Sequence, residues 1–308
     1  MQEKQDRLLG ILPDVRIRDP FILPDPATRT YYLVTSRTWL AAGSQGVDVY
    51  TSPDLRAWSG PRPVFEVPQS FWGDQAVWAP EMHAYRGRYY LFMTFTGQEL
   101  APRPPNWSKL EQRGTQVLVA DSPLGPFLPF QNRAHTPADW MALDGTLWVE
   151  DGQPYMVFCH EWIQVKDGTM ELVRLKDDLS DIEGEPVTLF RASEAPWGTG
   201  LRNRDGAYVT DGPFLYRTRT GDLLMIWSSF GAGGYTTGIA YSETGKVRGP
   251  WKQQAKPLFA ADGGHSMILR SFDGALLLTL HQPNRNPDER AYLLPLQDLG
   301  DTLRIAGT

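Results

Sequence analysis

The sequence predicts an all-β fold, a five-bladed β-propeller in which each blade is a four-stranded antiparallel sheet. Turn formers are spread over the whole chain, since 29 Gly and 25 Pro occur among its 308 residues, and this density punctuates short strands better than long helices. No segment keeps a 3.6-residue period over three turns, so helix is expected only as isolated turns. One short pattern also returns five times along the chain, which is typical of a repeat architecture.

The recurring pattern is a turn followed by a run of aromatic or aliphatic residues. The five runs are residues 30–35, 87–94, 152–158, 221–227 and 274–280. The last four begin at a glycine, and these glycines are 65, 69 and 53 residues apart. This spacing leaves room for a four-stranded unit with loops of variable length.

A further short strand pattern precedes each run, and another follows it. The preceding segments are residues 19–22, 81–84, 144–148, 211–215 and 265–269, and the following ones are 47–53, 116–123, 171–175, 237–242 and 291–296. Five such sheets arranged radially leave only short, protected edges. The repeats place residues 1–308 in one domain. The alternative fold is a β-sandwich whose strands resemble one another by accident.

Two connections are longer than strand pairing requires. Residues 97–114 lie inside the second blade, and residues 191–208 join the third blade to the fourth. Long loops on a rigid β scaffold are usually functional rims or simply variable. Trp107 and Trp197 lie near the tips of these connections, so each is expected either on a ligand rim or in plain packing.

The composition excludes several classes of partner. The chain has 30 Lys and Arg against 36 Asp and Glu, a net charge of −6, and no basic run, so neither nucleic acid nor an anionic membrane is expected to bind. Residues 1–14 lack the apolar core of a secretory signal. A cytoplasmic location is therefore expected, or a secreted one if a leader has been removed. The single cysteine, Cys159, excludes an intramolecular disulfide, and no pattern indicates an oligomeric state.

Acidic residues begin four of the five predicted inner strands. In a propeller these strands line the central channel, so Asp19, Glu81, Asp144, Asp211 and His265 should meet in one funnel. Asp followed by Gly or Pro is also common in ordinary turns. The recurrence of an acidic residue at this place in nearly every blade favours a functional site instead. Clustered carboxylates repel one another, so some should have raised pKa values while others stay ionised. Glycoside hydrolysis needs this division, because one carboxyl protonates the leaving oxygen and another activates water or attacks the sugar.

Aromatic residues accompany these carboxylates. The chain has 11 Trp, 12 Tyr and 13 Phe, and several lie on or beside the predicted inner strands: Trp78, Trp148, Trp162, Trp227 and Phe230. Sugar rings present apolar C–H faces that stack on aromatic platforms, although each Trp alone also suits a core. As a set, the aromatic residues and the carboxylates indicate a carbohydrate site.

Short motifs in all five blades carry a resemblance to a known family. They are Arg-Asp-Pro at 18–20, Trp-Ala-Pro-Glu at 78–81, Leu-Asp-Gly-Thr at 143–146, Thr-Asp-Gly-Pro-Phe at 210–214 and Gly-His-Ser at 264–266. Each motif is weak alone, and their order and blade-by-blade placement are specific. The chain resembles glycoside hydrolase family 43, five-bladed propeller enzymes that cleave arabinofuranosides, xylosides and some galactosides with inversion.

The resemblance implies roles for three carboxylates. Asp19 would be the general base that activates water, and Asp144 would orient the acid and tune its pKa. The fourth-blade position, where the family usually has a glutamate as general acid, holds Asp211. Either Asp211 protonates the glycosidic oxygen, or the proton comes from Glu194 or Glu161. Inversion implies acid and base carboxyls roughly 6.5–9.5 Å apart.

The same resemblance suggests ligands around these residues. Substrate contacts are expected from Trp78, Glu81, Trp148, Glu161, Trp162, Phe230, His265 and Arg290. His265 occupies the position at which many members of the family have a channel histidine near a hydrated calcium ion. The alternative is a histidine that only forms hydrogen bonds within the funnel. No cofactor is expected to be required, and a structural Ca²⁺ in the central channel is compatible with the resemblance.

The expected function is that of a glycoside hydrolase, exo-acting and inverting, of the α-L-arabinofuranosidase or β-xylosidase class. It would release a terminal pentose or galactose-type sugar from plant-type oligosaccharides. The alternatives are a non-catalytic sugar-binding propeller, a β-galactosidase or galactofuranosidase, and a phosphorylase, which would need arginines such as Arg18, Arg202, Arg204 or Arg290 beside the sugar. A metal-dependent hydrolase is disfavoured, since the five histidines show no paired-ligand spacing.

Overall fold

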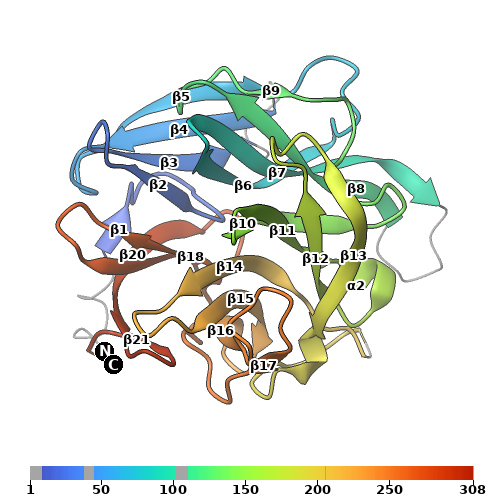
Figure 1. The fold of residues 1–308 in the computed structure, drawn as a ribbon, viewed down its shortest axis with the longest axis vertical. Coiled ribbons are helices and arrows are strands. Elements are labelled where there is room, and N and C mark those ends of the chain that lie inside the picture. The colour runs from blue at the N-terminus through green and yellow to red at the C-terminus, as the bar shows by residue number, and fades with distance from the viewer. Residues whose placement is uncertain (1–8, 38–44, 102–109, 205, 308) are drawn as a thin grey trace.

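Five antiparallel sheets surround a common axis in the computed structural model, which describes residues 9–37, 45–101, 110–204 and 206–307 (Figure 1). In each sheet one edge strand faces the axis and the other strands follow outward. The predicted five-bladed propeller is confirmed, and the alternative of a sandwich is wrong. Helix occurs in the described residues only as the short turns α2 (Trp162–Val165) and η1 (Ala192–Glu194), as expected.

The first three blades follow the chain in simple up-and-down order, because each strand pairs with the next one along the chain. Blade one contains β2 (Phe21–Asp25), β3 (Thr30–Ser36), β4 (Gly46–Ser52) and β5 (Ser59–Glu66). Blade two contains β6 (Ala76–Tyr85), β7 (Arg88–Ala101), β8 (Leu110–Ala120) and β9 (Leu128–Pro129). Blade three contains β10 (Ala142–Glu150), β11 (Gln153–His160), β12 (Thr169–Leu175) and β13 (Ile182–Arg191).

The last blade joins the two ends of the chain. Blade four contains β14 (Asp211–Arg217), β15 (Leu223–Gly231), β16 (Gly234–Ser242) and β17 (Trp251–Gln253). Blade five contains β18 (Gly264–Arg270), β19 (Leu276–Gln282), β20 (Arg290–Asp298), the N-terminal β1 (Leu9–Ile11) and the C-terminal β21 (Leu303–Ile305). β1 pairs with β20, Leu9 opposite Leu293, so the ring of blades is closed by strand pairing between residues far apart in the sequence.

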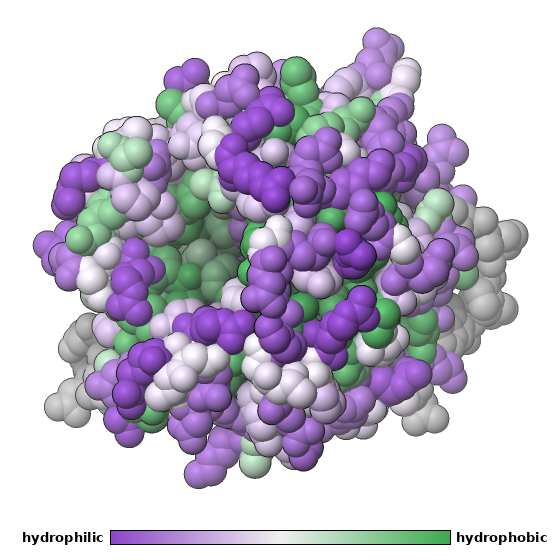
Figure 2. Space-filling view, viewed as in Figure 1, coloured by the Kyte–Doolittle hydropathy of each residue, from purple (hydrophilic) through white to green (hydrophobic). Residues whose placement is uncertain are grey.

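The core lies between neighbouring blades, where the aromatic and aliphatic runs face each other. The largest fully buried side chains include Trp227, Tyr235, Phe92 and Phe158. Trp227 is therefore a core residue, the alternative that the sequence left open for each Trp. The face in Figure 2 is mostly hydrophilic and is hollowed over the first and fifth blades, with hydrophobic residues on the floor of the hollow. Among the described residues, no helix is long and apolar enough to cross a membrane.

Candidate active site

A β-bulge near the start of the inner strands aims side chains at the axis. In blades two to five the pairing between the first two strands shifts register at this point, and one residue in each bulge has a positive φ: Ala79 (41°), Asp144 (56°), Gly212 (48°) and His265 (49°). Asp19, just before β2, has φ 51°. Bulges re-aim side chains and are common next to active sites, and positive φ is strained for residues other than glycine.

The bulge sets the true alignment between blades. Asp144 and His265 occupy the bulge position, and Asp19 has a similar positive φ just before β2. Asp211 lies one residue before the bulge position and Glu81 two residues after it. The expectation that all five residues share one register is therefore wrong for Glu81 and Asp211. Gly212 holds the bulge position of blade four, where a Cβ would come within 2.9 Å of the His265 ring.

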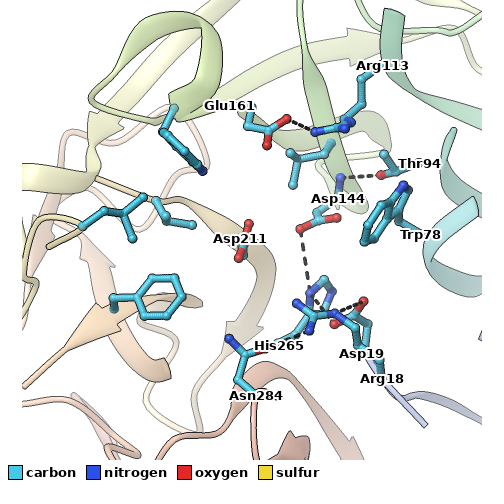
Figure 3. A pocket seen from close by; sticks show the side chains of 15 residues that line it. Arg18, Asp19, Trp78, Thr94, Arg113, Asp144, Glu161, Asp211, His265 and Asn284 are labelled. Atoms are coloured by element: carbon cyan, nitrogen blue, oxygen red, sulfur yellow. Dashed lines mark hydrogen bonds and ion pairs between the residues drawn. The ribbon is translucent and has the colours of Figure 1, made fainter. Parts of the chain in front are cut away.

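Most of the expected residues meet in one pocket of about 340 Å³. Figure 3 shows that its side chains come from all five blades and point toward a common space. The lining residues that the sequence predicted are Asp19, Trp78, Asp144, Glu161, Trp162, Asp211, Phe230 and His265. The other lining residues are Arg18, Thr94, Arg113, Leu143, Leu201, Val209 and Asn284.

Asp19 is a buried carboxylate surrounded by nitrogen atoms. Its Oδ1 is 3.2 Å from Nδ1 of His265, and its Oδ2 is 3.5 Å from Nε of Arg18. Burial opposes ionisation, but the imidazole of His265 and the guanidinium of Arg18 outweigh it, so the pKa of Asp19 lies below its usual value. The Asp19 backbone N–H donates to Nδ1 of His281 at 3.2 Å, which fixes the backbone. The neighbouring charges keep the carboxylate ionised.

Asp144 and Asp211 have the opposite electrostatic environment. Burial raises the pKa of Asp144 to about 7, with His265 opposing and the Asp211 carboxyl adding to the rise. Burial likewise raises the pKa of Asp211, against the influence of His265 and of a hydrogen bond from Tyr235. The Gly212 backbone N–H donates to Oδ2 of Asp144 at 3.0 Å. Because the two carboxyls interact, their protonation is coupled.

His265 lies between the carboxyls, which favour its charged form. Burial disfavours its charged form, but Asp19, Asp144 and Asp211 outweigh burial and raise its pKa. Its Nδ1 is also 3.8 Å from Oδ2 of Asp144. The described residues hold no group of three or more acidic, histidine or cysteine side chains arranged to bind a metal, so they offer no set of several direct ligands for a calcium ion.

One wall of the pocket is built around Arg113. Its Nη1 forms an ion pair with Glu161, its Nη2 is 2.9 Å from Oε2 of Glu111, and its guanidinium carbon lies 5.9 Å from the centre of the Trp78 ring. Trp78 and Arg113 both donate to Oγ1 of Thr96, each at 3.1 Å. This shared acceptor fixes the indole and the guanidinium relative to each other.

Three expected substrate contacts lie outside the pocket. Glu81 is buried and pairs with Nε2 of His83 at 2.8 Å. Trp148 packs against the core of blades three and four, with Arg217 over its ring at 5.5 Å. Arg290 donates to the backbone carbonyl of Pro13 at 2.8 Å, so it ties the N-terminal segment to blade five.

In the connection between blades three and four, the structure favours plain packing over a ligand rim for Trp197. Trp197 is only 9% exposed and its ring lies 5.1 Å from that of Trp227, so it belongs to the core and not to a ligand rim. The same connection supplies Leu201 to the pocket. Glu194 accepts a hydrogen bond from the Arg191 backbone N–H at 2.9 Å and does not line the pocket. Trp107 lies outside the described residues.

Sequence reasoning missed several residues that shape the site. Arg113, Asn284 and His281 come from the second and third strands of their blades or from the turns after them. The sequence does hold a signal for His281. It lies near the end of the second strand of its blade, as do the predicted residues Glu161 and Phe230 in theirs. No such position in the sequence indicates Arg113, since it lies inside the long strand β8.

The comparisons with known proteins agree with this geometry. The family model of glycosyl hydrolases family 43 matches residues 12–303. An endo-arabinase structure from Bacteroides thetaiotaomicron is 40% identical, with a TM-score of 0.82, over 94% of this chain and 96% of that one. The extracellular exo-alpha-(1->5)-L-arabinofuranosidase ArbA of Cellvibrio japonicus is 23% identical over 259 residues, 75% of this chain and 67% of the relative. An α-L-arabinofuranosidase structure from Lactobacillus brevis has the same fold, with a TM-score of 0.74 at 18% identity over 99% of both chains. The chain belongs to glycosyl hydrolases family 43 and is a glycoside hydrolase.

Proposed function

We propose that this enzyme hydrolyses α-L-arabinofuranosyl linkages with inversion, with Asp19 as general base and Asp211 as general acid. The observation that carries the proposal is the opposite shift of two pKa values in one pocket. The pKa of Asp19 is lowered and that of Asp211 is raised. Two carboxyls whose environments push their pKa values apart are the pair that acid–base catalysis requires.

The proposed reaction is a single displacement. Asp19 takes a proton from a water molecule while the water oxygen bonds to the anomeric carbon. The bond between that carbon and the glycosidic oxygen breaks, and Asp211 gives its proton to the leaving oxygen. The sum is one water added across one glycosidic bond, with Asp19 protonated and Asp211 ionised until the two exchange protons with solvent.

Asp144 is proposed to tune the acid. It lies in β10 of blade three and accepts a hydrogen bond from the Gly212 backbone N–H. This bond fixes the bulge that follows Asp211. When Asp144 is ionised, its negative charge would disfavour ionisation of Asp211, as like charges do at short range. His265 would balance the remaining charge between Asp144 and Asp19.

Arabinose is proposed as the sugar because the relatives named for arabinose linkages include the endo-arabinase structure at 40% identity and the exo-arabinofuranosidase. Exo action is proposed from the pocket, whose volume of about 340 Å³ is at the low end of ligand pockets, about 300–1,000 Å³. A space of this size suits a terminal sugar better than the middle of a polymer. A xylosidase is the second candidate, since a xylanase from Bacteroides thetaiotaomicron shares the fold.

Phosphorolysis is less well supported. Of the four arginines that the sequence offers for a phosphate site, only Arg18 lines the pocket. Arg18 is occupied there, because its Nη1 donates to Oδ1 of Asn284 at 2.8 Å and its Nε faces Asp19. A phosphate would have to displace these partners, so water is the proposed nucleophile.

The direct test is the stereochemistry and size of the first product. The enzyme is mixed with nitrophenyl α-L-arabinofuranoside, β-D-xyloside, β-D-galactoside and β-D-galactofuranoside, and separately with linear α-1,5-arabino-oligosaccharides. Release of arabinose as the β-anomer, seen by proton NMR before mutarotation, is expected. The α-anomer as first product would overturn inversion, and oligosaccharide products alone would overturn exo action.

Removal of calcium is expected to leave the chemistry intact. Because the described residues offer no direct ligand set, dialysis against EDTA should change kcat/KM by less than about twofold. If calcium is held through water, its removal should instead lower the melting temperature, since a ligand that binds only the folded state stabilises that state. A loss of kcat/KM above about tenfold, restored by Ca²⁺ and not by Mg²⁺, would contradict this expectation.

A further inference from the structure

Tyr235 is a buried tyrosine whose hydroxyl reaches the proposed acid. It lies in β16, one strand outside β15, and its side chain is fully buried. Its O–H donates to Oδ2 of Asp211 at 2.9 Å. Burial and the Asp211 charge raise the pKa of Tyr235 well above its usual value, so the phenol stays neutral and acts as a hydrogen-bond donor.

The ring of Tyr235 is held by its neighbours in two blades. It stacks on His281 with centroids 5.5 Å apart and planes at 21°, and it contacts Phe230 at 5.6 Å. A Cβ at position 264 would come within 2.7 Å of its Cε1, so Gly264 is needed to admit the ring. Because the side chain is wedged in this way, the direction of its hydroxyl is fixed.

This direction decides which oxygen of Asp211 carries the proton. A protonated carboxyl has one O–H donor and one carbonyl acceptor. An oxygen that already accepts the hydrogen bond of Tyr235 serves best as the carbonyl, which leaves the proton on the other oxygen. Among the described residues, no hydrogen bond occupies Oδ1 of Asp211, a residue that lines the pocket.

We propose that Tyr235 is a positioning residue for the general acid, which keeps the transferable proton of Asp211 on Oδ1, facing the glycosidic oxygen. The inference rests on the proposed role of Asp211. It also accounts for how the short aspartate is fixed where the family usually has a glutamate, since the phenol reaches in from β16 to meet it.

The other groups that face Asp211 define the expected change in pH dependence. Arg18 and His265 favour its ionised form, and Asp19 disfavours it. Asp144 and Glu161 also interact with Asp211, from blade three. The hydrogen bond from Tyr235 favours the carboxylate. Removing this bond alone should raise the pKa of Asp211, so the acid stays protonated to a higher pH.

The test compares Tyr235→Phe with a matched control in blade four. Tyr216 also donates to an aspartate, Oδ2 of Asp298 at 3.0 Å, but lies outside the pocket. In Tyr235→Phe the alkaline limb of kcat/KM should move up by about one pH unit, since a hydrogen bond to a charged group is lost, and the optimum value should fall about tenfold. Tyr216→Phe should move neither quantity.

A second substitution keeps the test open if Tyr235→Phe does not fold. Incorporation of 3-fluorotyrosine at position 235 keeps the ring and makes the hydroxyl a stronger donor, so the alkaline limb should move to lower pH. Opposite shifts in the two variants support the inference. A fall in activity with an unmoved alkaline limb in the folded variants overturns it, because a merely structural role would produce that result.

The failure of this inference is distinguishable from failure of the proposed function. If Tyr235 acts through Asp211, then Tyr235→Phe should have no further effect in an Asp211→Asn background, as a double-mutant cycle would show. A collapse of activity in Asp211→Asn with additive effects in the double variant overturns the role of Tyr235 alone. Full activity in Asp211→Asn would overturn the acid itself.

Discussion

Asp19→Asn is expected to lower kcat/KM by about 10²–10⁴-fold, the usual contribution of a general base. Asn has nearly the same shape, so the pocket and the sugar contacts remain. The amide, however, does not take a proton from water. Steady-state hydrolysis of nitrophenyl α-L-arabinofuranoside measures the loss, and calorimetric titration with arabinobiose measures binding, which should stay within about threefold.

The control for Asp19→Asn is a second buried aspartate with an arginine partner. Asp48 in β4 is 6% exposed, as is Asp19, and its Oδ1 is 3.0 Å from Nε of Arg37. Asp48→Asn should leave kcat/KM within about twofold. If Asp19→Asn kept more than a tenth of the activity, Asp19 would not be the base. If the wild-type enzyme bound these sugars and hydrolysed none of the glycosides, the propeller would be a binding protein.

The fold could be predicted because its signal is repeated. Each blade has a turn and an apolar run, and five copies outweigh the ambiguity of any single strand. The closing pair of strands carried no such signal. β1 is only three residues long, and its partner β20 lies nearly the whole chain away. A pairing of that kind is decided by tertiary packing and not by a local pattern.

The site could be predicted only in part, because its chemistry depends on the bulges. Asp19, Asp144 and His265 share a positive φ and were found from the repeat. Glu81 has the same residue type at nearly the same place, yet the bulge at Ala79 turns it toward His83. Tyr235 and Arg113 were missed because they lie on outer strands. Only side-chain length and packing bring Tyr235 to Asp211 and Arg113 to the pocket.

Asp211→Asn should have the second large effect, and its size should depend on the leaving group. With oligosaccharides, whose leaving alcohols need a proton, kcat/KM should fall by about 10²–10⁴-fold. With a 2,4-dinitrophenyl glycoside, whose leaving group departs as a stable anion, the fall should be under about tenfold. The alkaline limb of the pH profile, which reports the essential acid, should also disappear.

Glu161→Gln is the comparison that identifies the acid. Burial raises the pKa of Glu161, but its ion pair with Arg113 favours the carboxylate, whereas Asp211 accepts its hydrogen bond from a neutral phenol. Glu161→Gln should therefore lower kcat/KM by a similar factor for all leaving groups, as the loss of a substrate contact would. A loss that grows with the basicity of the leaving group in Glu161→Gln, and not in Asp211→Asn, would assign the proton to Glu161 and leave Asp211 as the residue that tunes it.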